Sequence, residues 1–215
     1  MLIRNYHAQR WLLALSSLSF IGLVWAVFSH VALLSVLDNL TAQLQLTMLP
    51  NLLHYFLSFI FFFSHSWGSC LVIFLLAFFL WGFKFKIPAF WLMTTSIISG
   101  ILLHIVDFIL PVTNFNHAMQ FPAFGIFWAT LIYTFVASFV GPEIQSIWRR
   151  STLHLVMLMM WCLVFLANLF QPDVQFSGVI AGWLFAIIVL ELFEHFYVQY
   201  APTLAKMNGF YGSWY

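Results

Sequence analysis

The sequence has 215 residues, of which 64% are hydrophobic and only 6% are charged, and its formal net charge is +1. A soluble domain carries about 25% charged residues, so this composition excludes a soluble protein and indicates an integral membrane protein. A net charge near zero gives no basis for binding nucleic acid. Cys70 and Cys162 both lie inside apolar runs, where cysteines are more typical of small core residues than of a disulfide.

Six apolar segments are long enough, or nearly so, to cross a membrane, which takes about 20 residues. They predict an all-α fold, a single membrane domain over residues 1–215 in which six transmembrane helices form a bundle with short loops. The expected spans are roughly 11–37, 52–83, 87–110, 122–141, 152–170 and 177–199. The first run is too long for the apolar part of a signal peptide, so we interpret it as an uncleaved helix.

Two stretches of the chain, one of them between the first two expected spans, leave alternatives open. The run 52–83 suits either one tilted helix or a short membrane-entry helix joined to a span. The stretch 38–51 is interpreted equally well as a short helix lying in the membrane interface or as a plain polar loop, because its leucines share one helical face. His65 lies in the middle of the second run, where it is either a packing histidine or the site of a kink.

All Lys and Arg residues can be placed on one side of the membrane. If they fell at random on either side, such agreement would arise roughly once in sixty cases. The pattern predicts that both termini are cytoplasmic and that the opposite face carries no Lys or Arg. The residues concerned are Arg4, Arg10, Lys84, Lys86, Arg149, Arg150 and Lys206.

Polar side chains gather near the expected outer ends of the spans, and ionisable groups within a membrane are by default candidates for function. The outer-pocket candidates are His104, Asp107, Asn114, His117, Asn168 and Asp173. Two His and an Asp are reasonable metal ligands. However, their spacing matches no metal motif, and hydrogen bonding between helices is the better interpretation. We therefore expect no metal and no cofactor.

A second polar group lies on the last span near the expected cytoplasmic surface. It consists of Glu191, Glu194 and His195, and Glu191 and His195 are four residues apart and so able to pair. A polar helix end that reaches the level of the lipid headgroups is the better interpretation. Nowhere does the spacing of side chains indicate a nucleophile with its base, and no glycine-rich loop would hold a phosphate.

Three short motifs nevertheless carry a resemblance. The segment 177–184 (SGVIAGWL) is similar to the Ser-Asp-Val-Leu-Ala-Gly-Trp-Leu with which the sixth helix begins in the type 2 phosphatidic acid phosphatase superfamily of membrane lipid phosphatases. The segment 121–125 (FPAFG) resembles Phe-Pro-Ser-Gly-His, which opens the fourth helix there, and Pro111 stands where that family has Arg-Pro. The resemblance covers about 38–183. It implies six spans, both termini inside, and an active site at the outer ends of the third to sixth helices.

The resemblance also implies that the catalytic residues are missing. It places the nucleophilic His at Val174, the acid His at Gly125 and the orienting Asp at Gly178. The Lys and two Arg that hold the phosphate in the family fall on Leu103, Leu110 and Asn168. Loss of one oxyanion donor alone costs about a hundredfold or more in rate. We therefore expect a scaffold that is retained and a phosphatase chemistry that is lost.

The expected function is that of a catalytically inactive membrane protein, a lipid-binding subunit or a partner of another membrane protein. The alternative is a lipid phosphate or diphosphate phosphatase with a divergent active site, for example one that uses His104, Asp107 and His117. The short loops favour a bacterial plasma membrane. An open, polar outer pocket would favour ligand binding, whereas a pocket filled by Leu103, Leu110, Phe124 and Val174 would favour a structural or partner role.

Overall fold

The computed structural model describes residues 6–46, 51–114, 117–210 and 213. Its α-helices are α1 (Tyr6–Phe28), α2 (Ala32–Leu46), α3 (Asn51–Ser64), α4 (Ser66–Gly82), α5 (Lys86–Ile109), α6 (Phe124–Phe135), α7 (Ile147–Leu169) and α8 (Phe176–Leu204). A π-helix, η1 (Val136–Val140), and a 3₁₀-turn, η2 (Gly141–Glu143), extend α6, and a second 3₁₀-turn, η3 (Asn208–Phe210), follows α8. Among these described elements, 5 helices are long and apolar enough to cross a membrane, or up to 6 spans if the bent pair α3–α4 is counted as one. The fold is the expected helical membrane bundle.

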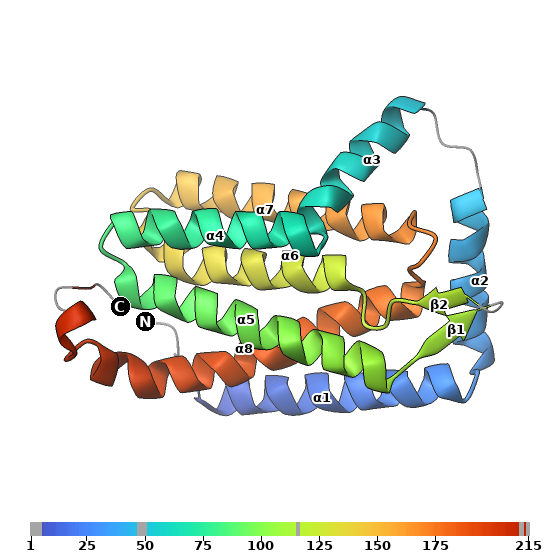
Figure 1. The fold of residues 1–215 in the computed structure, drawn as a ribbon, viewed down its shortest axis with the longest axis horizontal. Coiled ribbons are helices and arrows are strands. Elements are labelled where there is room, and N and C mark those ends of the chain that lie inside the picture. The colour runs from blue at the N-terminus through green and yellow to red at the C-terminus, as the bar shows by residue number, and fades with distance from the viewer. Residues whose placement is uncertain (1–5, 47–50, 115–116, 211–212, 214–215) are drawn as a thin grey trace.

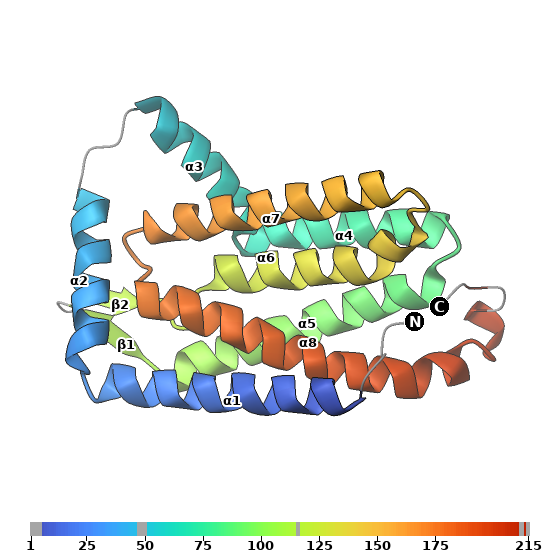
Figure 2. The same cartoon turned by 180° about the vertical axis from the view of Figure 1, so that it is seen from behind.

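Helix α6 lies at the centre of the bundle. Figures 1 and 2 show α4 and α7 on one side of it and α5 and α8 on the other, with α1 packed along the outside of α8. Phe127 and Leu131 of α6 are almost completely buried and pack into a core with Leu92 of α5 and Val189 of α8. Of the candidate spans, the one that contains α6 is the most buried, with 56% of its apolar window inside the protein, so most of its surroundings are protein. The outer helices instead expose large apolar side chains, as lipid-facing helices do.

The first expected span, 11–37, is wrong at its C-terminal end. Helix α1 stops at Phe28, and His30 takes a positive φ of 50°. His30 N then donates to Val27 O (3.1 Å) and Val31 N donates to Ala26 O (3.1 Å), which together form a Schellman motif that closes the last carbonyls of the helix. Glycine usually holds this left-handed position, so a His there gave no stop signal in the sequence.

The residues after this break form α2, which lies across one end of the bundle (Figures 1 and 2). Of the two alternatives for 38–51, the structure therefore has a helix over the described part, although it begins earlier, at Ala32. The segment 111–121, between the third and fourth expected spans, contains a difference from an all-α fold. Strands β1 (Val112–Asn114) and β2 (His117–Met119) pair there as an antiparallel hairpin, with Val112 opposite Met119.

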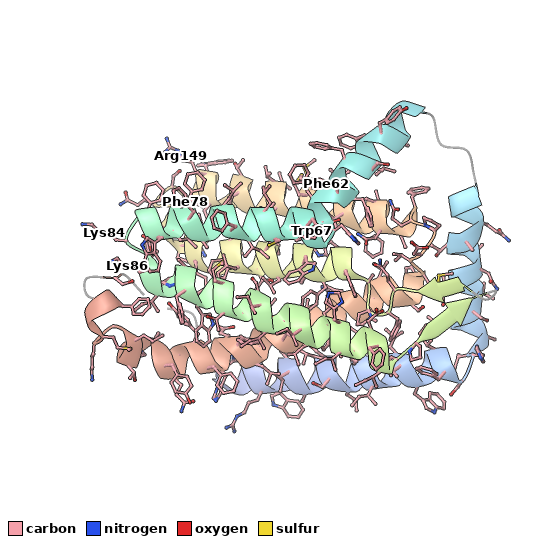
Figure 3. All side chains as sticks on the ribbon, in the orientation of Figure 1. Phe62, Trp67, Phe78, Lys84, Lys86 and Arg149 are labelled. Carbon is pink, nitrogen blue, oxygen red and sulfur yellow. The ribbon has the colours of Figure 1, made fainter. Side chains whose placement is uncertain are left out.

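The second expected span is broken. The segments Tyr55–Ser64 and Trp67–Gly82 are bent by 59°, with the extended residue His65 between them. The kink interpretation of His65 is therefore confirmed. Gly68 is what allows the tight corner, because a Cβ atom at this position would collide with Phe62 O. Phe62 and Trp67 flank the corner and are exposed (Figure 3).

Candidate functional site

The segment before α6 is held in place from two neighbouring elements. Phe121 N donates to Asp107 Oδ1 of α5 at 3.1 Å, and Gln120 N donates to the backbone oxygen of Asp173, in the loop between α7 and α8, at 2.8 Å. The two acidic residues that the sequence singled out are therefore brought to the same segment. They serve it differently, since Asp107 uses its side chain and Asp173 uses its main chain while remaining exposed.

The start of α8 packs directly on this segment. Ala123 N donates to Gly178 O at 2.9 Å. A Cβ atom on Gly178 would lie 2.7 Å from Gln120 O, and one on Gly182 would collide with Ala123 O. Only glycine permits backbone contact this close between a helix and a neighbouring segment. The two glycines of the sixth expected span are thus packing positions, with no room for a larger side chain at Gly178.

Asn168, near the C-terminal end of α7, lies against the first turn of α6. A Cβ atom on Gly125 would stand 2.5 Å from Asn168 Oδ1 and 2.6 Å from Asn168 Nδ2. Asn168 is fully buried; its Nδ2 donates to Val164 O at 2.8 Å, while its Oδ1 has no hydrogen-bond partner in the described structure. The Asn168 carboxamide therefore occupies the space beside Gly125 and is not accessible to a ligand.

The other residues at this end are apolar and closely packed. Leu103 and Val174 are each 1% exposed and Phe124 is 7% exposed, while Leu110 is half-buried. Filled interiors of this kind have packing densities close to those of organic crystals. Side chains therefore fill the space around these motif positions, and the cleft of about 140 Å³ at this end lies elsewhere, beside His30, Asp38 and Gln175.

His104 and Asp107 have separate contacts. The His104 ring is exposed and packs edge-on against Phe124, with ring centroids 4.9 Å apart. Among the described residues, no hydrogen bond joins His104 to Asp107. The backbones of Asn114 and His117 lie opposite each other in the hairpin, but their side chains lie outside the described part of the structure. In the part that is described, no group of three or more His, Cys, Asp and Glu side chains is placed to hold a metal.

Asp38 of α2 is a polar residue at this end that sequence reasoning missed. Its Oδ1 accepts a hydrogen bond from Ser177 N, in the first turn of α8, at 2.9 Å. A carboxylate at a helix N-terminus satisfies a free N–H and interacts favourably with the helix dipole. Burial raises the pKa of Asp38 above its ordinary value of 3.8, and the hydrogen bonds with Ser177 lower it in part. In the sequence, the only sign of a role for Asp38 was its position as a single acidic residue in a leucine-rich stretch.

The cations lie at the opposite end of the bundle. Lys84, Lys86 and Arg149 project from the far end in Figure 3. Arg10 is near the start of α1 and Lys206 follows α8, and both elements have these ends on the same side (Figure 1). Among the described residues, no Lys or Arg lies at the end that carries Asp38, Asp107 and Asp173. An anionic ligand would thus meet acidic side chains there with no cation to offset the repulsion.

No family model matches the chain, and no curated protein matches its sequence. The fold has a counterpart in the crystal structure of a transmembrane PAP2-type phosphatidylglycerolphosphate phosphatase from Bacillus subtilis. The TM-score is 0.73, and the match covers 87% of this chain and 96% of that chain at 12% sequence identity. The chain has the PAP2 fold. The resemblance read from three short motifs is thereby supported at the level of the fold.

Within this PAP2 fold, the motif positions converge in space. Gly125, Asn168 and Gly178 come from three different helices, and backbone or side-chain contacts link each of them to the segment that opens α6. Such convergence could not be read from the sequence, because α6, α7 and α8 are separated by loops. At each of these positions the structure has a small or uncharged residue with its surroundings packed around it.

Proposed function

We propose that this protein is a catalytically inactive member of the PAP2 fold class and acts as a lipid-binding or partner subunit in the membrane. The cation-bearing end would face the cytoplasm, as positively charged loops do. A bacterial plasma membrane is the simplest setting, given the short loops and the bacterial protein that shares the fold. The protein's ligands would be membrane lipids, and its partner another membrane protein.

The observation that carries this proposal is the packing of Asn168 against Gly125. The resemblance assigns these positions to a phosphate-binding Arg and to the acid His. Here the Asn168 side chain leaves no room for even a methyl group on Gly125. Val174, at the position of the nucleophile, has no reactive group and is buried. A phosphoryl group would find neither space, nor nucleophile, nor a positively charged donor.

The alternative of a divergent phosphatase is less well supported. It would rely on His104 and Asp107, but Asp107 Oδ1 is engaged with Phe121 N, and the His104 ring packs on Phe124. A general base has to reach the proton of its nucleophile at about 3 Å. The positions of these two residues instead suit a structural role in holding the start of α6.

Catalysis can be tested directly with purified protein in detergent. Phosphate release would be measured from phosphatidic acid, phosphatidylglycerol phosphate and undecaprenyl diphosphate, with an active PAP2 phosphatase in the same detergent as a positive control. We expect no release above the background of empty detergent. Turnover that is present in the wild type and lost in His104→Ala or His117→Ala would overturn the proposal.

A second experiment separates the two inactive roles. The protein would be solubilised gently from its membrane, purified, and subjected to mass spectrometry for both lipids and proteins. A stoichiometric membrane protein that co-purifies would support the partner role, and an enriched lipid class would support the lipid-binding role. Recovery of the protein alone, with lipids in the same proportions as in the bulk membrane, would contradict both.

A further inference from the structure

A separate cavity of about 50 Å³ lies between α5, α6 and α8, in the half of the bundle that carries the cations. Its α5 wall includes Trp91 and Thr95, which are five and nine residues from Lys86 at the start of that helix. With a rise of about 1.5 Å per residue, these side chains lie roughly 7–14 Å inside the bundle. The cavity therefore lies inside the bundle, away from the Gly125–Asn168 contact.

One wall of the cavity is a π-helix. Ser138 and Phe139 of η1 line it, directly after α6. π-Helical turns are rare, and where they interrupt α-helices they are frequently found at functional sites. The wider turn displaces the side chains that follow from the ordinary helical positions. The backbone is thus irregular in η1, the part of this wall that follows the regular α-helical residues Leu131, Thr134 and Phe135 of α6.

The polar groups in the wall are hydroxyls and a single carboxylate. Thr95 is 5% exposed, and its Oγ1 has no hydrogen-bond partner in the described structure. Thr134 and Ser138 add hydroxyls, and Glu194 supplies the carboxylate. A buried hydroxyl without a partner is destabilising, so the cavity offers hydrogen-bond capacity that the protein itself does not use. Among the described lining residues, Glu194 is the only acid, and none is a Lys, Arg or His.

The remaining wall is aromatic. Trp91 packs edge-on against Tyr197, with ring centroids 5.5 Å apart, and Tyr197 against Phe139, at 5.2 Å. Trp91 also contacts Phe193 at 6.2 Å. Aromatic faces attract ligand cations that lie within about 6 Å of the ring centroid. A carboxylate among the rings adds an opposite charge when it is ionised, and a bound ammonium would favour that ionised form.

We infer that this cavity binds an organic ammonium group, held by the Glu194 carboxylate, the Thr95 hydroxyl and the faces of Trp91 and Tyr197. A primary ammonium has three N–H donors, which match one carboxylate and the hydroxyls of the wall. The volume of the cavity suits the ammonium and a methylene or two rather than a larger ion. The ligand is either a free alkylamine or the ethanolamine headgroup of a lipid. This inference does not depend on the proposed function.

The free amine is tested by isothermal titration calorimetry with purified full-length protein in detergent. The probe is ethylammonium, and the neutral comparison is ethanol, which has the same number of heavy atoms. We expect ethylammonium to bind and ethanol not to bind. Glu194→Gln should weaken binding at least tenfold, because the carboxylate charge is lost. Thr95→Val keeps the Glu194 carboxylate and the shape of the residue 95 side chain, and should weaken binding less.

The matched control is Glu191→Gln. Glu191 lies one turn from Glu194 on α8 but borders a different cleft, together with Gln9 and Arg10 of α1. This variant should bind ethylammonium as the wild type does. Each variant must elute as a single species with unchanged helical content. Equal binding of ethanol and ethylammonium, or Glu194→Gln that binds ethylammonium like the wild type, would refute the inference.

A lipid headgroup is tested in nanodiscs that contain equal amounts of phosphatidylethanolamine and phosphatidylglycerol. Native mass spectrometry would count the lipids retained by the wild type and by Glu194→Gln. Retention of phosphatidylethanolamine that is lost in Glu194→Gln and kept in Glu191→Gln would identify a lipid as the source of the amine. Binding of ethylammonium without such retention would identify a soluble amine. If neither probe binds, the cavity is not an ammonium site.

Discussion

The carboxamide of Asn168 lies so close to Gly125 that a Cβ atom there would stand 2.5 Å from Asn168 Oδ1. The two residues come from α7 and α6 and are both buried. Each explains the other, since a side chain of this size fits only beside a glycine. Gly125 and Asn168 stand where the resemblance expects a His and an Arg, and the contact joins the two residues in one packed arrangement.

A double-mutant cycle would test this contact. We expect Gly125→Ala to destabilise the protein by about 1–3 kcal/mol, because the added methyl group overpacks the site. In an Asn168→Ala background the same change should have little effect, since the carboxamide that it would meet is gone. The measurement is thermal unfolding of the purified protein in detergent, and residues in contact give coupling energies of about 0.5–3 kcal/mol.

The control for the cycle is Gly100→Ala on α5. A Cβ atom there would lie 3.5 Å from the Trp128 side chain, which is an ordinary contact distance. Gly100→Ala should change the unfolding temperature little, both in the wild type and in the Asn168→Ala background. If Gly125→Ala and Asn168→Ala prove additive, the two residues do not compete for the same space.

Gly182 of α8 should not tolerate a side chain. A Cβ atom there would collide with Ala123 O, which belongs to backbone and cannot rotate away. We therefore expect Gly182→Ala to lower the thermal midpoint and Gly22→Ala, on exposed α1 with nothing within 4 Å, to leave it unchanged or raise it. Alanine in a helix is favoured over glycine by about 1 kcal/mol. An equal response of the two variants would contradict this account of the α6–α8 contact.

Asp38 should make stability depend on pH. Because burial raises its pKa in the folded protein, the folded state binds a proton more tightly than the unfolded state. The free energy of unfolding should therefore be higher below the ordinary pKa of 3.8 and fall as the pH rises through the folded value. Asp38→Asn removes this titration while it keeps an acceptor for Ser177 N. The difference in stability between wild type and Asp38→Asn should thus change between acidic and neutral pH, and a constant difference would show that Asp38 titrates normally.

The membrane orientation can be tested with single cysteines in a background that lacks Cys70 and Cys162. Asp173 and Glu143 are both exposed and lie in loops at opposite ends of α7. A membrane-impermeant maleimide added to intact cells should label Asp173→Cys and not Glu143→Cys, which should react only after the cells are opened. Labelling in the reverse order would place the cations outside and overturn the proposed orientation.

Much of the bundle could be read from apolar runs, and the exceptions have identifiable causes. The break after α1 is closed at His30, and the end of α4 is closed in the same way at Lys84, with φ of 50° and 67° respectively. Lys84 N donates to Trp81 O and Phe85 N to Leu80 O. Helix ends of this kind normally carry glycine or asparagine. His and Lys give no comparable signal. The end of α4 was therefore indicated only by the charges of Lys84 and Lys86.

The positions of the candidate site and the end of the bundle that carries it were predictable from the resemblance, but the contacts within the site were not. The sequence alone indicated which motif residues were absent, since Val174, Gly125 and Gly178 are visible in the chain. It could not indicate that Asn168 would be fully buried or that Asp107 would bind Phe121 N. It also left Asp38 unnoticed, because its partner Ser177 is 139 residues away.

The sequence by itself determined that this protein is helical, membrane-embedded and positively charged at one end. These properties depend on the composition of short stretches of the chain, and a membrane span needs little more than about 20 apolar residues in succession. Only the tertiary structure decided that Asn168 is buried against Gly125 and that Glu194, Thr95 and Trp91 share a cavity. Both depend on contacts between helices, whose distances and angles are set by the shapes of side chains far apart in the chain.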